Sequence, residues 1–258
     1  MFSLSIQGKL LETRIAFYIF VLYNKGNNSY LRGKVMEILP YYQKEVICLH
    51  CKHKFKSTKI RSKFIKLETH DTDFQPIYQN NEINPLLYNV FVCEHCGFSF
   101  TDDFTKYFAP SVKDAIKENI TKQWTSRSYG GERTIQEGIT AYKLGIICAS
   151  IKKEKFVSIA GLALRVAWLY RILGQQDEEK RFLEIARDRY IDSYSREDYS
   201  GTQMSEIRVL YMIAELSRRV GARDLATRYF SMILEKQSSS IEPSLIEMAK
   251  ERWQEMRT

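Results

Sequence analysis

The sequence predicts an α+β protein in which a small β-rich domain precedes an all-α domain. Two observations predict this order: two Cys-x-x-Cys pairs lie in the first half of the chain, and the apolar period changes from two residues to that of a helix near residue 110. The chain has 258 residues, 44% of them apolar, and so exceeds the ~100 to 200 residues of a typical domain. We therefore expect domains at residues 36–110 and 111–258, after a separate leader.

The leader, residues 1–35, contains five basic residues and one acidic residue, which is half of the formal net charge of +8. Its apolar run Ile15–Tyr23 is shorter than the ~20 residues that span a bilayer, so no transmembrane segment is expected, and no secretory cleavage site follows it. Leu31–Val35 can be encoded by a purine-rich stretch that resembles a ribosome-binding site. Our hypothesis is a misassigned or disordered leader with Met36 as the true first residue; a short membrane-surface anchor is the alternative.

Four of the five cysteines form the two Cys-x-x-Cys pairs, Cys48 with Cys51 and Cys93 with Cys96. A tetrahedral Zn²⁺ bound by four thiolates needs two ligand pairs that converge from two separate turns, and this spacing lets one turn present two sulfurs. The pattern predicts a zinc-ribbon-like domain with one structural Zn²⁺ per chain. Catalytic zinc is not expected, because four thiolates leave no open position for water.

A thiol-disulfide redox site is the less favoured interpretation of the same pairs. A histidine precedes the second cysteine of each pair, as in oxidoreductases whose thiol pKa is lowered by such a neighbour. However, the first pair leads into a basic strand, where those enzymes have a helix. We expect His50 and His95 to be exposed, and His53 is the one residue that could substitute for a cysteine ligand.

Residues from about 41 to 105 alternate with period two and predict β-strands. The alternation is clearest over residues 52–63, with a shift of register at Ser57–Thr58. Each Cys-x-x-Cys pair is expected at the tip of a hairpin. Gly97 suits the tight turn after the second pair, whereas Lys52–His53 occupies the corresponding place after the first, which predicts a less favourable turn there.

The segment Lys52–Lys66 contains seven basic residues and no acidic ones. It could bind phosphates, with Phe55 and Phe64 stacking on bases. Alternatively, its lysines offset the charge of the metal site and protect an edge strand. Because residues 36–110 are neutral overall, a nucleic-acid-binding zinc ribbon is the alternative and not the main prediction. The candidate contact residues are Lys54, Lys56, Arg61 and Lys63.

The helical period begins after Pro110. Ser111 with Asp114 predicts a capping box, Gly130–Gly131 interrupts the pattern, and Thr134 with Glu137 predicts the cap of the next helix. The first helix is expected to carry an apolar stripe of Val112, Ala115, Ile116, Ile120 and Trp124. Further helices are expected at about 157–173, 177–194, 204–219, 223–237 and 243–256.

Two of these helix pairs resemble tetratricopeptide repeats, with small, aromatic and large residues at the motif positions. The first pair contributes Ala167, Tyr170, Gly174, Leu183 and Ala186, and the second contributes Leu210, Ala214, Gly221, Ala226 and Phe230. The match is partial, because Gly174 and Gly221 are 47 residues apart and the repeat pitch is about 34. Stacked pairs would present a concave face for a protein or peptide; an ordinary helical bundle is the alternative.

The remaining candidates for chemistry have structural explanations. Residues 70–73, His-Asp-Thr-Asp, are expected to form a turn. Cys148 lies in an apolar helix and is expected to be buried. The sequence shows neither a Ser/His/Asp set nor a Gly-rich phosphate loop, so we do not expect an enzyme.

Five short motifs occur in an order that resembles the uncharacterised bacterial family catalogued as domain of unknown function 2225. They are Glu45–Cys51, Lys59–Ser62, Asp71–Phe74, Asn84–Tyr88 and Val92–Phe98. The similarity extends from Met36 nearly to the carboxy terminus, and members typically begin with a segment like Met36–Tyr42. This chain departs at Lys52–His53, where the family has residues near a glycine. The resemblance implies a bacterial, cytoplasmic zinc protein and indicates no substrate.

Together these observations predict a non-enzymatic scaffold or protein-interaction module. A protein or peptide is the expected partner of the helical domain, and nucleic acid is the alternative partner. Arg61, Asp71 and Asp73 match motif positions of the family. They are expected either to hold the segment between the cysteine pairs together through ion pairs or to mark a surface for a partner.

Overall fold

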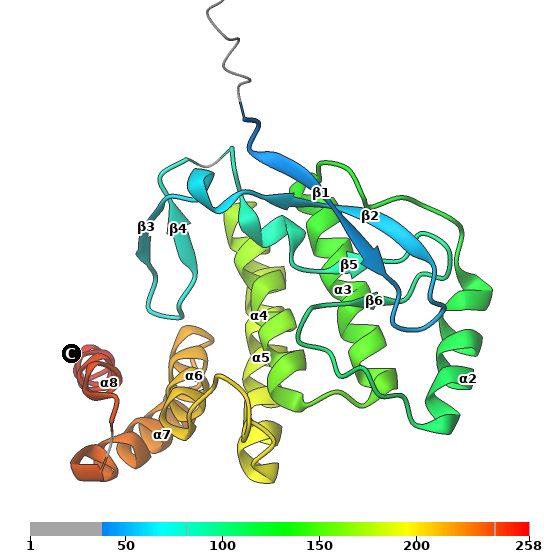
Figure 1. Cartoon of the computed structure of the whole chain (residues 1–258). Coiled ribbons are helices and arrows are strands. Elements are labelled where there is room, and N and C mark those ends of the chain that lie inside the picture. Colours follow the sequence, from blue (N-terminus) through cyan, green and yellow to red (C-terminus); the bar gives the residue numbers. More distant parts are fainter. Residues whose placement is uncertain (1–37, 81, 240, 258) are drawn as a thin grey trace, which may run out of the picture. The chain divides into compact units, whose positions relative to one another are not determined.

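The computed structural model describes residues 38–80, 82–239 and 241–257. The leader hypothesis, including Met36 as the first residue, concerns residues outside these ranges. Leu39–Thr258 forms one compact unit. Strand pairs occupy its amino-terminal part and helices its carboxy-terminal part, which confirms the α+β prediction (Figure 1).

The strands form three antiparallel pairs, each of two strands. The pairs are β1 (Tyr41–Ile47) with β2 (Lys54–Ile60), β3 (Leu67–His70) with β4 (Pro76–Tyr78), and β5 (Phe91–Val92) with β6 (Ser99–Phe100). In the first pair Val46 faces Phe55 and both are buried, whereas Glu45 faces Lys56 and both are exposed. The alternation of period two therefore places one face of this hairpin against the core.

The predicted strand over residues 59–63 is wrong beyond Ile60. Arg61 and Ser62 accept backbone hydrogen bonds from Phe64 (3.0 Å) and Ile65 (3.0 Å), which closes a short 3₁₀-helix. The 3₁₀-helices are Ser62–Phe64, Pro85–Tyr88, Thr121–Gln123 and Gln237–Ser239. Alternating charge without apolar residues on one face does not by itself continue a strand.

Seven α-helices are described between residues 110 and 255. They are α2 (Pro110–Asn119), α3 (Ile135–Lys152), α4 (Phe156–Ile172), α5 (Gln176–Arg196), α6 (Glu206–Arg219), α7 (Arg223–Glu235) and α8 (Pro243–Glu255). Gly174 and Gly221 follow the ends of α4 and α6 with φ of 69° and 84°, as expected of helix stops. Among the described residues, no helix has the length and apolarity needed to cross a membrane.

The two predicted helix caps have different outcomes. At α3, Thr134 Oγ1 accepts a hydrogen bond from the Glu137 N–H (3.2 Å), and Glu137 Oε2 accepts one from the Thr134 N–H (3.0 Å), which confirms the capping box. The capping box at Ser111 is wrong, because α2 begins one residue earlier with Pro110 in its first turn. Proline is suited to that position, since its missing N–H would have no helical partner there.

The strand pairs and the helices share one hydrophobic core. Helix α3 contributes two glycines to the contact. Leu87 Cδ2 lies 2.7 Å from the place of a Cβ at Gly138, and Val90 Cγ1 lies 3.5 Å from that at Gly145. The absence of side chains at these positions lets the segment before β5 pack closely on α3 (Figure 1). The division into two domains and the tetratricopeptide-like stacking stay predictions.

The segment between the two cysteine pairs is held by ion pairs to the helices. Asp73 pairs with Arg171 of α4 (2.7 Å), and Asp71 pairs with Arg171 (3.0 Å) and with Arg219 of α6 (2.6 Å). Arg61 takes no part: its Nε donates to the Leu39 carbonyl (3.2 Å). The expected turn at residues 70–73 is present, with the Phe74 N–H donating to the Asp71 carbonyl (2.8 Å).

Candidate metal centre

The two Cys-x-x-Cys pairs lie in turns with the same backbone geometry, which we name the first knuckle (residues 48–53) and the second knuckle (residues 93–98). In the first knuckle the N–H of Cys48 donates to the His53 carbonyl (2.9 Å), and the N–H of Lys52 donates to the Cys48 carbonyl (3.1 Å). In the second, residues 93, 97 and 98 make the same two bonds at 3.1 and 2.8 Å. Each knuckle connects the strands of a hairpin, β1–β2 or β5–β6.

Both knuckles point their sulfurs toward one place. The four Sγ atoms of Cys48, Cys51, Cys93 and Cys96 all lie within 4.8 Å of one another. Across the knuckles, Cys48 Sγ is 3.7 Å from Cys96 Sγ, and Cys51 Sγ is 3.7 Å from Cys93 Sγ. A tetrahedral ion with metal–sulfur bonds of about 2.3 Å places its ligands about 3.8 Å apart. These four side chains could therefore hold a metal ion.

The charges of the four thiols are linked by their proximity. Thiol hydrogen bonds from Cys48 and Cys96, together with backbone N–H groups, lower the pKa of Cys93. The same proximity raises the pKa of Cys48 and of Cys96. Without a cation, one ionised cysteine in this cluster disfavours the ionisation of the next, because their negative charges repel. A divalent cation would stabilise all four thiolates.

The histidines of the knuckles lie outside the sulfur cluster. His53 stacks on His95 with ring centroids 5.2 Å apart, and its Nε2 is 3.7 Å from Glu94 Oε1. Among the described residues, the group of potential ligands at this place contains the four cysteines and no histidine. His95 is exposed as expected, but the same expectation for His50 is wrong, since His50 lies half-buried against Phe98 and burial lowers its pKa.

Trp124 covers the second knuckle. Its Nε1 donates to the Glu94 carbonyl (2.8 Å), and its ring lies 2.6 Å from where a Cβ at Gly97 would stand. The predicted placement of Trp124 on the stripe of α2 is wrong, because that helix ends at Asn119. Sequence reasoning missed this contact, since only the fold brings the tryptophan back onto the turn.

Cys148 connects α3 to the second hairpin. The Ser99 N–H donates to its Sγ (3.2 Å), and burial raises its pKa to about 12. The cysteine is fully buried, as expected, and its high pKa does not favour a nucleophilic thiolate.

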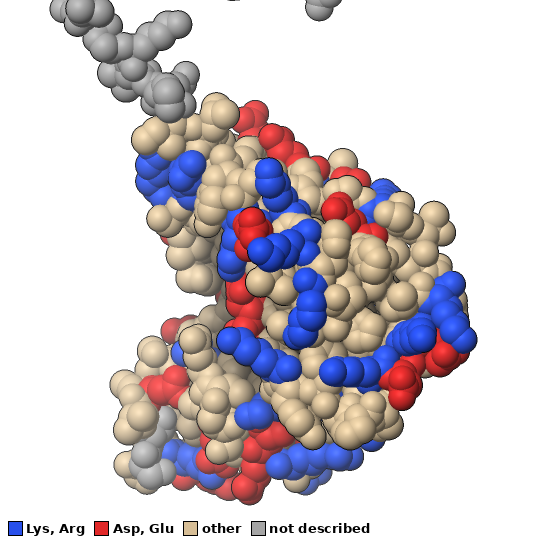
Figure 2. All heavy atoms as spheres, turned by 45° about the vertical axis from the view of Figure 1, so that its right-hand side comes forward, with Lys and Arg blue, Asp and Glu red and all other residues tan. Residues whose placement is uncertain are grey.

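Of the two phenylalanines expected to stack on bases, Phe64 is half-buried and Phe55 is buried. Phe55 is only 5% exposed, so its ring is not accessible. The candidate contact residues are exposed: Lys54, Lys56, Arg61 and Lys63. Lys54 Nζ lies 3.9 Å from Glu45 Oε1. On the face shown in Figure 2, basic side chains are interspersed with acidic and uncharged ones. Nucleic-acid binding through these residues stays a prediction.

The fold and the site define an α+β protein with four convergent cysteines between two hairpins and a helical carboxy-terminal part. The chain belongs to the family described as an uncharacterized protein conserved in bacteria (DUF2225), which it matches over residues 41–256. The match confirms the resemblance seen in the sequence. A search of curated proteins found no match, and a search of solved structures found none.

Proposed function

We propose that this protein is a non-enzymatic scaffold or protein-interaction module whose amino-terminal part is held by one structural Zn²⁺. The observation that carries the zinc assignment is the 3.7 Å separation of both cross-knuckle sulfur pairs. Four thiolates form a soft donor set that favours Zn²⁺ over Mg²⁺ or Ca²⁺. The ion would fix the two hairpins to each other and complete the amino-terminal fold.

The interaction role rests on the helical part. Helices α4 to α7 pack in sequence, each against the next, and glycines end α4 and α6. Such stacking resembles tetratricopeptide repeats and would offer a surface for a protein or peptide. The cytoplasm is the proposed location, because the five cysteines, all described, form no disulfide with one another and cytoplasmic cysteines stay reduced.

Metal content tests the zinc assignment. We expect one zinc per chain by mass spectrometry in protein purified without chelator, and loss of that zinc in Cys93→Ser. Cys148→Ser is the matched control: it removes a buried thiol of the same type outside the cluster and should keep the metal. Absence of metal, with thiols of the two pairs that cycle between dithiol and disulfide, would instead support the redox interpretation.

The scaffold assignment needs its own experiment. Proteins captured on the purified chain should still bind to a variant in which four basic residues are changed to Ser: Lys54, Lys56, Arg61 and Lys63. They should also remain bound to the parent chain when the salt concentration is raised. Association that disappears with either change would instead support nucleic acid as the partner.

A further inference from the structure

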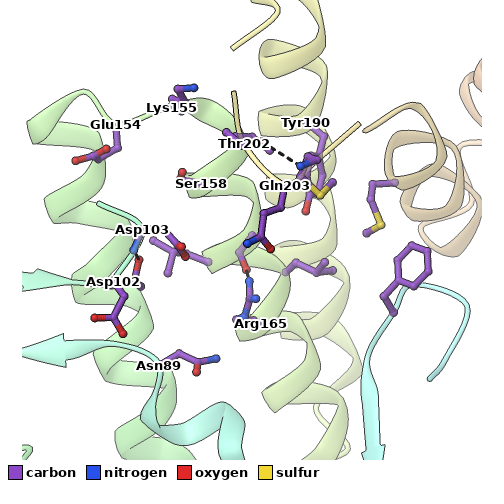
Figure 3. Close-up of a pocket in the computed structure, with 18 of the residues that line it drawn as sticks. Asn89, Asp102, Asp103, Glu154, Lys155, Ser158, Arg165, Tyr190, Thr202 and Gln203 are labelled. Carbon is purple, nitrogen blue, oxygen red and sulfur yellow. Dashed lines mark hydrogen bonds between the residues drawn. The ribbon is translucent and has the colours of Figure 1, made fainter. Parts of the chain in front are cut away.

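A cavity of about 1020 Å³ lies between α4, α5, the loop after β6 and the loop before α6 (Figure 3). Its size is at the upper end of the range typical of small-molecule sites. The polar residues that Figure 3 labels are Asn89, Asp102, Asp103, Glu154, Lys155, Ser158, Arg165, Tyr190, Thr202 and Gln203.

Arg165 of α4 is the half-buried cation of this cavity. Its Nη1 donates to the Gly161 carbonyl (2.9 Å), and its guanidinium lies 5.9 Å from the Trp168 ring. No carboxylate pairs with Arg165 in the part of the chain that the structure describes. A guanidinium has five N–H donors, so most of this one's hydrogen-bonding capacity is free to meet an anion.

The other basic residues of the lining are already engaged. Lys59 Nζ is 3.8 Å from Asp102 Oδ2, and Arg208 Nη2 is 3.4 Å from Glu242 Oε1. Lys155 Nζ donates to the Ser200 carbonyl (2.7 Å). Lys59 and Arg208 therefore have carboxylate partners, whereas Arg165 and Lys155 each donate only to a backbone carbonyl among the described residues.

Neutral hydrogen-bond donors surround the same space. Tyr190 of α5 is only 4% exposed, and within the described ranges its hydroxyl makes no hydrogen bond. Burial raises the pKa of Tyr190 to about 12, so the hydroxyl keeps its proton and can donate. The side chains of Ser158 and Gln203 also line the cavity without a hydrogen-bond partner in those ranges. An anion would satisfy these donors together.

The lining also holds carboxylates and apolar side chains. Three of the carboxylates have cationic partners: Asp73 pairs with Arg171, Glu154 with Lys152 and Asp102 with Lys59; the fourth is Asp103. The apolar side chains are those of Leu162 on α4, Met204 in the loop before α6 and Met212 on α6, which cannot bind an inorganic ion but can contact carbon atoms. Methionine adapts its shape to irregular apolar groups. The lining thus suits a ligand with both a charged and an apolar part.

Gly161 sets the position of Arg165. A Cβ at Gly161 would stand 3.1 Å from Arg165 Nη1, so any side chain there would push the guanidinium away from its carbonyl anchor. Ser158, Gly161, Arg165 and Trp168 recur at helical spacing of three and four residues, which places them on one face of α4.

We propose that this cavity binds a small organic anion, with its carboxylate or phosphate group on Arg165 and Tyr190 and its apolar part against Leu162 and Met212. The proposal is independent of zinc and of the scaffold role. It assigns the chain a ligand site to which α4, α5 and α6 contribute residues.

Isothermal titration calorimetry on the full chain tests the proposal. The probes are inorganic phosphate and AMP for the phosphate arm, and citrate and N-acetylglutamate for the carboxylate arm, in a dilute buffer that contains neither group. We expect saturable one-to-one binding in one arm, at least about tenfold weaker in Arg165→Gln, since a charge-assisted hydrogen bond contributes that much. Tyr190→Phe, which keeps the ring, should weaken binding to a smaller extent.

The matched control is Arg181→Gln, which removes the same charge from an exposed site on α5 paired with Glu178 (3.3 Å). It should bind like the parent. Thermal unfolding without probe distinguishes a ligand role from a structural one: Arg165→Gln should be at least as stable as the parent. Absence of heat with all four probes at millimolar concentration, equal binding by Arg165→Gln, or a marked loss of its stability would each overturn the proposal.

Discussion

The two knuckles have the same backbone hydrogen bonds but different surroundings. The first knuckle connects β1 and β2, whose outer face is exposed at Glu45, Lys54 and Lys56. The second knuckle connects β5 and β6, all of whose residues are buried, and Trp124 covers its turn. The difference indicates that packing supports the second knuckle, whereas the metal would be the main support of the first.

Removal of the metal should have the largest effect on the difference between the two knuckles. With zinc taken out by a chelator, we expect the amides of residues 41–60 to lose protection from hydrogen exchange while those of residues 91–100 keep it. The physical reason is that a structural zinc contributes on the order of 10 kcal/mol to a small fold, and the first hairpin buries only one of its faces, whereas β5 and β6 are buried throughout.

Hydrogen exchange followed by mass spectrometry provides the measurement, and readdition of Zn²⁺ provides the control, because it should restore protection at residues 41–60. Equal loss at both hairpins would show that the knuckles depend on the metal alike. Equal retention would show that packing supports both.

The segment between the knuckles allows the second test, since charges hold it to the helices. Asp73 has a fully buried side chain and pairs with Arg171, whereas the side chain of Asp71 is 31% exposed. Asp73→Asn should destabilise the protein by about 3 kcal/mol, because it removes a buried carboxylate that accepts hydrogen bonds from Arg171 and Trp168 and sets an amide N–H donor against these donors. Urea denaturation measures the change.

Asp71→Asn is the matched control and should cost clearly less, because water solvates part of that site. Both variants should keep their zinc, since the ion pairs lie apart from the sulfur cluster. Loss of metal in Asp73→Asn would mean that the connecting segment and the knuckles form one cooperative unit.

The cysteine cluster could be predicted from sequence because each Cys-x-x-Cys spacing fixes the local turn, and one ion can then join two such turns. The helices could be predicted for a similar reason: the capping box at Thr134 and the stops at Gly174 and Gly221 are encoded within a few residues. The 3₁₀-helix at residues 62–64 could not, because its alternating charges imitate a strand.

Contacts between distant residues were beyond sequence reasoning. Trp124 lies on Gly97, and Arg171 pairs with Asp73, only because the chain returns to the same place after many residues. Arg165 carries no recognisable motif at all. Its significance depends on which cations around it have partners, and only the folded structure shows that.

Gly97→Ala is the third test and addresses the second knuckle alone. The substitution should cost about 2–4 kcal/mol, because the residue has φ of 75° and its Cβ would lie 2.6 Å from the Trp124 ring. Gly131→Ala is the control, since nothing lies within 4 Å of its Cβ. Comparable thermal unfolding of the two variants would contradict the role of Trp124 as a tight cover.

The smallest expected effect concerns Lys52, which occupies in the first knuckle the place of Gly97 in the second. Lys52 has φ of 64°, a conformation that costs a residue with a Cβ about 1–2 kcal/mol. Lys52→Gly removes this cost but adds chain entropy to the unfolded state, so we expect a net gain of about 0.5 kcal/mol.

Lys54→Gly is the matched control, because it deletes the same side chain from an exposed strand position and should destabilise by about 0.5–1 kcal/mol. Urea midpoints at fixed, saturating Zn²⁺ measure both, since metal binding would otherwise shift the apparent stability. Opposite signs for the two variants would mean that the first knuckle tolerates lysine at a glycine position. A loss of stability in both variants would mean that the Lys52 side chain stabilises the turn despite its strained backbone. Lys52 Nζ donates a hydrogen bond to the Leu49 carbonyl (2.9 Å).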